Sequence, residues 1–241
     1  MESLISEKGK RNMNYTDTKV ALLQTRLNQP ITSVMDKLGY QKCVLDLFRL
    51  SETDWKNLYP DEAAKLQSHL KPHETRTIFD IGKETVLAWI LEDLTALYTL
   101  RKGRQVKRNG SDASRQFTYL SETRAKPDLL VSADGGKTFR KVEVTSSYTD
   151  FFQVNGYQSF RFDKLPRMQA DKAILLTLDI YANRLFAAEA ADLFSMPHGG
   201  GKYLKREERV TFDHAILKRE GDEIQILPVE WRQIPEGFWK V

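Results

Sequence analysis

The stretch KPDLLVSADGGKTFRKVEVTSS, residues 126–147, decides the fold of this chain. It contains two runs rich in Leu and Val, residues 129–132 and 140–146, which have the length and composition of β-strands. The Asp-Gly pair at 134–135 lies between them and favours a tight turn. The stretch therefore predicts a β-hairpin.

Two acidic residues lie near one end of this expected hairpin. Asp128 comes just before the first strand, and Glu143 lies within the second. Alternate side chains of a strand share a face, so Lys141 and Thr145 point to the same side as Glu143. Pairing of the strands would bring Asp128 beside Glu143. Two carboxylates at the end of an apolar sheet suit Mg²⁺, which can polarise a phosphoryl oxygen and activate a bound water.

Apolar periodicity predicts helices before the hairpin and both helices and strands after it. A polar tail is expected over residues 1–14, several helices over 16–70, and single helices over 78–100 and 150–165. Further strands are expected over residues 116–120, 173–178 and 225–229, with an amphipathic segment over 183–194. This order predicts a mixed α/β fold.

The composition fits a folded protein with one large domain and an appendage. The 241 residues are 41% hydrophobic and 29% charged, and the formal net charge is +4. We expect a helical N-terminal extension over residues 1–75 and a main domain over 76–241. Glu92 and Asp93 interrupt the longest apolar stretch, so no membrane span is expected. Cys43 is the only cysteine, which excludes an internal disulfide and favours a reducing, cytoplasmic location.

The Pro127-Asp128 pair followed by Glu143-x-Thr145 on the next strand resembles the PD-(D/E)XK nuclease superfamily. This superfamily includes restriction endonucleases, recombination exonucleases and Holliday-junction resolvases. The resemblance covers residues 78–180 and implies a restriction-endonuclease-like core, in which helices flank a mixed central sheet. It also implies a DNA endonuclease that depends on Mg²⁺ or Mn²⁺, with Asp128 and Glu143 as metal ligands.

The resemblance extends to the helices on either side of the hairpin. The first helix of such nucleases often adds a glutamate to the metal site, and Glu84 is the matching candidate here. Some members carry a Gln-xxx-Tyr motif on the helix after the hairpin. Gln153 and Tyr157 match that motif, and Arg161 and Lys164 would continue the same helical face.

One position departs from the family pattern. The family expects a lysine two residues after the acidic residue of the second strand, and Thr145 stands there. Lys164 is the first candidate to replace it and Lys141 the second. If neither reaches the acids, a catalytically silent nucleic-acid-binding or assembly module becomes the better interpretation. An RNA endonuclease of the cap-snatching type, which also has a Glu-x-Thr strand, is the third.

Two basic clusters suggest a polyanionic partner, with double-stranded DNA as the expected one. A run of basic side chains can also be a solvated helix end, and that alternative stays open. A homodimer or larger assembly is compatible with the sequence. The candidate phosphate contacts in these clusters are Arg101, Lys102, Arg104, Lys107 and Arg108, and then Lys202 and Lys205.

The histidines do not form a recognisable zinc motif. His69 and His73 are four residues apart, but Pro72 lies between them and is expected to end a helix before His73. We therefore expect solvated or capping roles for them.

Overall fold

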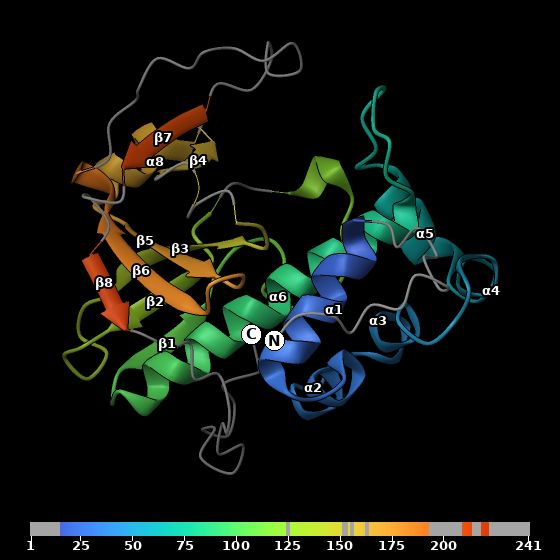
Figure 1. Ribbon diagram of the computed structural model, residues 1–241, viewed down its shortest axis with the longest axis horizontal. Coiled ribbons are helices and arrows are strands. Elements are labelled where there is room, and N and C mark those ends of the chain that lie inside the picture. The colour runs from blue at the N-terminus through green and yellow to red at the C-terminus, as the bar shows by residue number, and fades with distance from the viewer. Residues whose placement is uncertain are drawn as a thin grey trace.

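The structure is a computed structural model that describes residues 15–123, 126–150, 154, 157–161, 164–192, 209–213 and 218–221. A helical part and a β-sheet lie on opposite sides of one long helix, α6 (Figure 1). The expected tail over residues 1–14 and the expected strand over 225–229 lie outside the described residues.

Five short helices precede α6, as the apolar spacing predicts. They end and restart at recognisable signals: the Ser51 side chain accepts a hydrogen bond from the backbone N–H of Asp54, and Pro60 occupies the first turn of the following helix. The helices are α1 (Tyr15–Leu27), α2 (Ile31–Lys37), α3 (Lys42–Asp46), α4 (Glu52–Leu58) and α5 (Pro60–Gln67).

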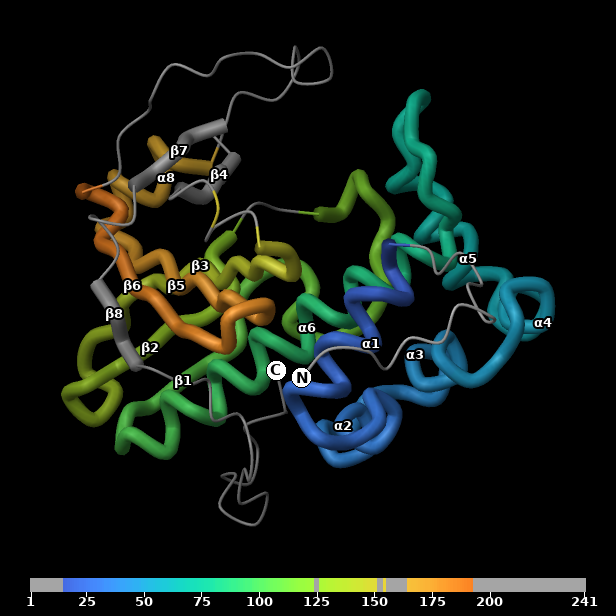
Figure 2. Tube along the Cα trace, in the orientation of Figure 1, coloured from blue at the N-terminus to red at the C-terminus, as the bar shows by residue number. Residues whose placement is uncertain are grey.

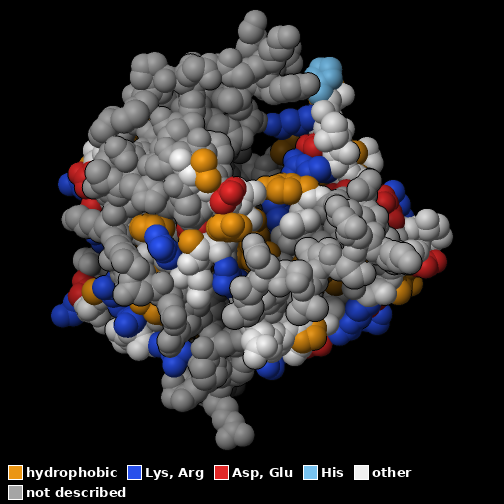
Figure 3. Space-filling view, in the orientation of Figure 1, with side chains coloured by type: hydrophobic (Ala, Val, Ile, Leu, Met, Phe, Trp, Pro, Cys, Tyr) orange, Lys and Arg blue, Asp and Glu red, His pale blue; other side chains and the backbone are white. Residues whose placement is uncertain are grey.

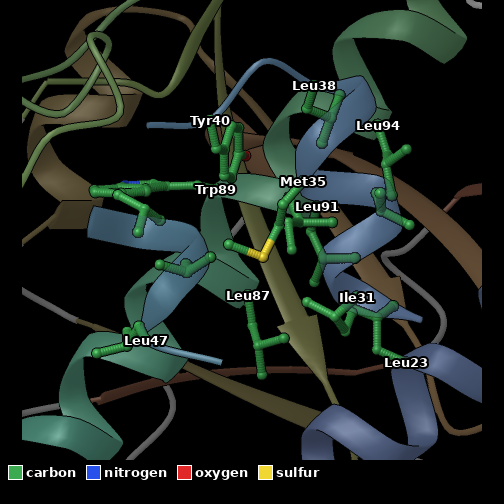
Figure 4. Close-up of a cluster of buried hydrophobic side chains, with 14 of the residues drawn as sticks. Leu23, Ile31, Met35, Leu38, Tyr40, Leu47, Leu87, Trp89, Leu91 and Leu94 are labelled. Carbon is green, nitrogen blue, oxygen red and sulfur yellow. The ribbon is translucent and has the colours of Figure 1, made fainter. Parts of the chain in front are cut away.

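Helix α6 (Ile78–Arg101) begins with a capping box, in which Thr77 and Asp80 each accept a hydrogen bond from the other's backbone N–H. Every residue from 89 to 97 is buried, so both sides of the helix are covered. On one side, Leu87, Leu91 and Leu94 pack with Leu23 of α1 and with Ile31 and Met35 of α2 (Figure 4). The hairpin strands pack against Ala96 on the other side.

The main sheet has six strands in the order β1-β2-β3-β5-β6-β8. Strands β3 and β5 are parallel and the other neighbours are antiparallel, so the sheet is mixed. The fold is therefore the expected α/β class, with helices flanking a mixed sheet. The strands are β1 (Gln105–Arg108), β2 (Leu129–Ser132), β3 (Arg140–Ser147), β5 (Ile174–Asp179), β6 (Arg184–Glu189) and β8 (Lys218–Gly221).

The expected hairpin is β2 and β3, joined by a turn in which Gly135 and Gly136 have φ angles of 75° and 89°. The expected strand over 173–178 is β5. The expected amphipathic segment over 183–194 forms β6 and then a single 3-10 turn, η3 (Ala190–Asp192).

Two elements differ from expectation. The helix expected over residues 150–165 is wrong over β4 (Tyr157–Arg161), which pairs with β7 (Arg209–Asp213) in a separate two-stranded sheet. Val154, before β4, is helical, and α8 (Leu165–Ala170) follows β4. The strand expected over 116–120 is also wrong: these residues end in a 3-10 turn, η1 (Leu120–Glu122), and the strand before the hairpin is β1.

The N-terminal helices and the sheet are joined through α6 into one structure. One cluster of buried side chains includes members of α1, α2, α6 and β5. The Arg26 guanidinium of α1 also donates to the backbone carbonyl of Ile180, at 2.9 Å, just after β5. The helical extension thus packs against the main domain. Among the described helices, none has the length and apolar character that crossing a bilayer requires.

Candidate functional site

Asp128 and Glu143 lie together at the end of the β2–β3 hairpin. Leu129 is paired with Val142, so Asp128 stands one position further along, opposite Glu143. An Asp128 carboxylate oxygen accepts a hydrogen bond from the backbone N–H of Val144, at 2.7 Å, and this bond fixes the side chain against β3. Glu143 is 4% exposed. We refer to these two residues as the acid pair.

Lys164 contacts the acid pair. Its ammonium group donates to a Glu143 carboxylate oxygen as a hydrogen-bonded ion pair. Lys164 immediately precedes α8, and the buried Leu165 and Met168 hold that helix in place. Lys141, the other candidate, pairs instead with Asp171 of the segment after α8, at 2.6 Å between Nζ and Oδ1. The lysine at the acid pair is therefore Lys164. This lysine reaches the acid pair from the start of α8, whereas the sequence pattern places it near the end of the Gln-xxx-Tyr helix.

The Asp128 carboxyl group of the acid pair resists ionisation. Burial, followed by the charge of the neighbouring Glu143, raises the pKa of Asp128 to about 7, against the lowering effects of the Val144 N–H and of Lys164. Two carboxylates that resist ionising together are stabilised when a divalent ion lies between them. Within the described ranges, no group of three or more His, Cys, Asp and Glu side chains is arranged to hold a metal ion.

Glu84, the third predicted metal ligand, does not face the acid pair. Its carboxylate pairs with Lys19 at 3.1 Å and with Arg76 at 2.8 Å, and it accepts a hydrogen bond from the Thr16 hydroxyl. These contacts tie α6 to α1 and to the segment before α6. The structure therefore does not bring Glu84 together with Asp128 and Glu143, whereas the sequence pattern predicts that the three lie together.

The acidic residue of α6 near Asp128 is Glu92. It lies eight residues after Glu84, which is about 12 Å along a helix axis. Burial and then the charge of Asp128 hold the pKa of Glu92 well above its usual range, and the Arg115 guanidinium donates to its carboxylate at 2.7 Å. One signal could have identified it: two consecutive acids inside a stretch that is otherwise apolar.

Glu92 belongs to a buried ion cluster of four side chains, Glu92, Asp93, Arg108 and Arg115. Arg108 makes two bonds to Asp93, of 2.7 and 2.8 Å, and Arg115 bridges Asp93 and Glu92. The four side chains are at most 8% exposed. Arg115 has a φ of 56°, uncommon for a residue with a side chain, and its ion pairs hold it there. The cluster therefore fixes the segment between β1 and β2 against α6.

The side chains of the basic run before the hairpin lie in two different environments, one buried and one exposed. Arg108 was a candidate phosphate contact, but its side chain is in the buried ion cluster, so that prediction is wrong. Arg101, Lys102, Arg104 and Lys107 are exposed. The antiparallel pairing of β1 with β2 places Gln105 opposite Ser132 and Arg108 opposite Leu129. Lys102 and Arg104 therefore lie toward the end of the hairpin that is distant from Asp128, where they line a separate hollow of about 440 Å³.

A cleft of about 430 Å³ opens beside the acid pair, between the sheet and the N-terminal helices. The space-filling view is hollowed in this region, and Lys and Arg side chains border the hollow (Figure 3). The residues that line the cleft come from three parts of the chain: Leu66 and His69 at and after α5; Thr85 and Trp89 of α6; and Gly110, Ser111, Asp112, Gln116, Phe117, Thr118, Leu120, Thr123, Lys126, Asp128 and Lys164.

One wall of the cleft is the segment between β1 and β2, which runs along α6 toward α5 and then returns to the sheet (Figure 2). Three hydrogen bonds fix it. A His69 ring nitrogen lies 2.8 Å from the Thr118 carbonyl oxygen, and the Leu120 N–H donates to the Ser68 hydroxyl at 3.0 Å. The Trp89 indole N–H donates to Asp112 at 2.6 Å. His69, expected to be solvated or capping, thus supports the cleft.

Several predicted contacts cannot be assigned a side-chain position. Gln153, Lys202 and Lys205 lie outside the described residues, and Tyr157 and Arg161 are described by the backbone of β4. Because β4 is a strand, Tyr157 does not continue a helical face with Gln153, and that part of the expected motif is wrong.

Comparison of the chain with protein-family models, curated proteins and solved structures gives no match. The resemblance to PD-(D/E)XK nucleases therefore depends on Pro127-Asp128, Glu143 and the lysine that contacts Glu143.

Proposed function

We propose that this chain is a metal-dependent endonuclease that hydrolyses phosphodiester bonds in DNA, with a restriction-endonuclease-like core. The observation that carries the proposal is the contact of Lys164 with the acid pair. Two carboxylates and an ammonium group, held by adjacent strands and the start of a helix, meet at the edge of a cleft. This combination suits phosphodiester hydrolysis, because it joins a site for a divalent cation to a positive charge that can face a phosphate.

In this proposal Asp128 and Glu143 hold Mg²⁺ or Mn²⁺, which supplies Lewis acidity and an activated water when it is bound. The Val144 N–H keeps the Asp128 carboxylate pointing at Glu143. Asp128 loses the proton that its raised pKa favours when the cation arrives. Lys164 stabilises the negative charge that develops on the phosphate, the role that the family gives to the lysine replaced here by Thr145.

A second candidate is the catalytically silent module on the same fold. It is favoured by one specific observation: the ammonium group of Lys164 already neutralises Glu143 without any added cation. A permanent ion pair of this kind could be structural. The two candidates differ in one result, because a silent module binds nucleic acid without cutting it in Mg²⁺ or Mn²⁺.

The test compares the wild-type protein with Asp128→Asn and Glu143→Gln, which remove the charges and keep the side-chain shapes. Supercoiled plasmid, linear duplex DNA and single-stranded RNA are incubated with Mg²⁺, Mn²⁺ or EDTA. We expect cleavage of DNA in Mn²⁺ by the wild type, none in EDTA, and loss of at least a hundredfold in rate in both variants.

Glu84→Gln is the matched control, since it removes an acid of α6 that does not face the acid pair. It should keep near wild-type cleavage. Binding of DNA with no cleavage in either metal would favour the silent module. Cutting of RNA alone would favour the endonuclease of the cap-snatching type. Equal activity in the wild type and in both acid-pair variants would refute the assigned site.

A further inference from the structure

We propose that the cleft beside the acid pair takes one unpaired nucleotide, so that the preferred substrate is a DNA strand with an unpaired segment rather than an intact duplex. The inference depends on the proposed function, because it concerns the substrate of the same site. Four properties of the molecule support it: the route by which a phosphate reaches the acid pair, the size of the cleft, the anchoring of its wall, and the groups that line it.

The acid pair is recessed. Glu143 is 4% exposed, and Asp128 is half-buried. Lys164 and Glu143 border a small hollow of about 30 Å³, and the larger open space that both Asp128 and Lys164 border is the cleft. A phosphodiester that reaches these two residues by this route must therefore bring part of its strand into the cleft.

The size of the cleft suits a single nucleotide. Its volume is about 430 Å³, within the range of roughly 300–1,000 Å³ that encloses molecules of this size. A base pair cannot enter such a space together with both of its backbones, since the major groove of B-form DNA alone is about 12 Å wide. An unpaired nucleotide needs only its own sugar and base to fit.

The wall of the cleft is anchored at several points. The segment between β1 and β2 is bonded to α5 and its flanking residues through Thr118 and Leu120, and to α6 through Asp112. Arg115 of the same segment is held by the buried ion cluster. Opening the cleft to admit a duplex would break these bonds and leave buried charges without partners, which is strongly unfavourable.

The groups that line the cleft differ between its two ends, as the charged phosphate of a nucleotide differs from its base. Lys126 and Lys164 lie at the end that holds Asp128, where the phosphate would bind. The remainder is lined by neutral polar side chains such as Ser111, Gln116 and Thr118, by apolar ones, and by Asp112, whose carboxylate accepts a hydrogen bond from the Trp89 indole N–H. Unstacked bases are recognised by hydrogen bonds to their edges and by apolar contacts, and groups of this kind supply both.

The experiment uses three DNAs of one sequence with the full-length protein and Mn²⁺: a single strand, a blunt duplex, and a duplex with an unpaired flap. We expect the single strand and the flap to be cut at least tenfold faster than the blunt duplex, with cuts in or next to the unpaired nucleotides. Equal or faster cutting of the blunt duplex would overturn this inference and leave the proposed function intact. Failure to cut any of the three would count against the proposed function itself.

Two further variants test the cleft directly. Ser111→Trp places a large side chain in the cleft, and Ser114→Trp is the matched control, because Ser114 is exposed on the same segment and does not line the cleft. We expect Ser111→Trp to lose at least tenfold in cutting of the flap, chiefly through KM, and Ser114→Trp to be unaffected. Equal activity of both on the flap would overturn the inference. If Ser111→Trp fails to fold, Thr123→Trp replaces it, since Thr123 lines the cleft and is exposed.

Discussion

Replacing Asp128 by Asn should stabilise the metal-free protein, and more so as the pH rises. In the folded chain, burial and the nearby Glu143 raise the pKa of Asp128 from 3.8 to about 7. The folded state therefore binds a proton more tightly than the unfolded state does. Stability falls as the pH rises wherever the folded state binds more protons, so the Asp128 carboxyl costs stability above its ordinary pKa. Asn keeps the shape and an acceptor for the Val144 N–H, and it removes this cost.

The size of the effect follows from the two pKa values. Between them, each pH unit lowers the free energy of unfolding by about 1.4 kcal/mol. From pH 5 to pH 8 the wild type should therefore lose up to about 3 kcal/mol through Asp128, a loss that the Asn variant avoids. For a chain of this length, 1 kcal/mol corresponds to roughly 2–4 °C in Tm. The Tm advantage of Asp128→Asn should therefore grow by up to about 6–12 °C across this pH range.

Thermal or urea unfolding in EDTA at pH 5, 6, 7 and 8 measures the effect. Asp134→Asn is the control of opposite sign, because hydrogen bonds from Ser132 and Thr138 hold the pKa of Asp134 well below its usual range. The stability that Asp134 supplies is complete above about pH 5, so its variant should be less stable by an amount that stays constant up to pH 8. A difference between Asp128→Asn and the wild type that is flat across the same range would refute the reasoning.

Three other outcomes follow from the site and the packing around it. Lys164→Ala should lower the rate of DNA cleavage by tenfold or more, mainly in kcat, whereas Lys141→Ala should change this rate little. Single-turnover assays of both variants measure the effect on the chemical step. Arg115→Met should lower the free energy of unfolding, measured in urea, by about 3–5 kcal/mol, because it leaves buried carboxylates unpaired. Arg104 is exposed, so Arg104→Ala should change this free energy by less than about 0.5 kcal/mol. Mn²⁺ should raise the Tm of the wild type more at pH 8 than at pH 6, since it displaces a proton, and calorimetry should show no such binding in Glu143→Gln.

The parts of the fold that local sequence determines could be predicted. The Asp-Gly turn between two apolar runs specifies the β2–β3 hairpin, and period-2 alternation places Glu143 at a position opposite Asp128. The helical spacing of residues 78–100 and the Thr77 cap specify α6. These features depend on neighbours within a few residues, which a single sequence displays.

The parts that depend on distant partners could not be predicted. Strand β4 exists because it pairs with β7, some fifty residues later, and nothing in its own spacing reveals that partner. Whether Glu84 or Glu92 lies near Asp128 depends on which part of α6 crosses the end of the hairpin. Whether the Arg108 side chain is exposed or buried depends on Asp93, a buried carboxylate that only packing brings near it. Lys164 reaches Glu143 from the start of α8, whereas the sequence pattern places this lysine on a helix that is interrupted by β4.

The burial of residues 89–97 of α6 on all sides has a consequence for how the protein can be divided. A shortened chain that starts at residue 76 keeps the acid pair, Lys164 and the sheet, and by sequence it is a complete main domain. It would nevertheless expose the face of α6 that Leu23, Ile31 and Met35 cover, a continuous apolar surface of the kind that drives aggregation. The N-terminal helices are therefore not a detachable accessory. They are the second half of the core on which the hairpin rests.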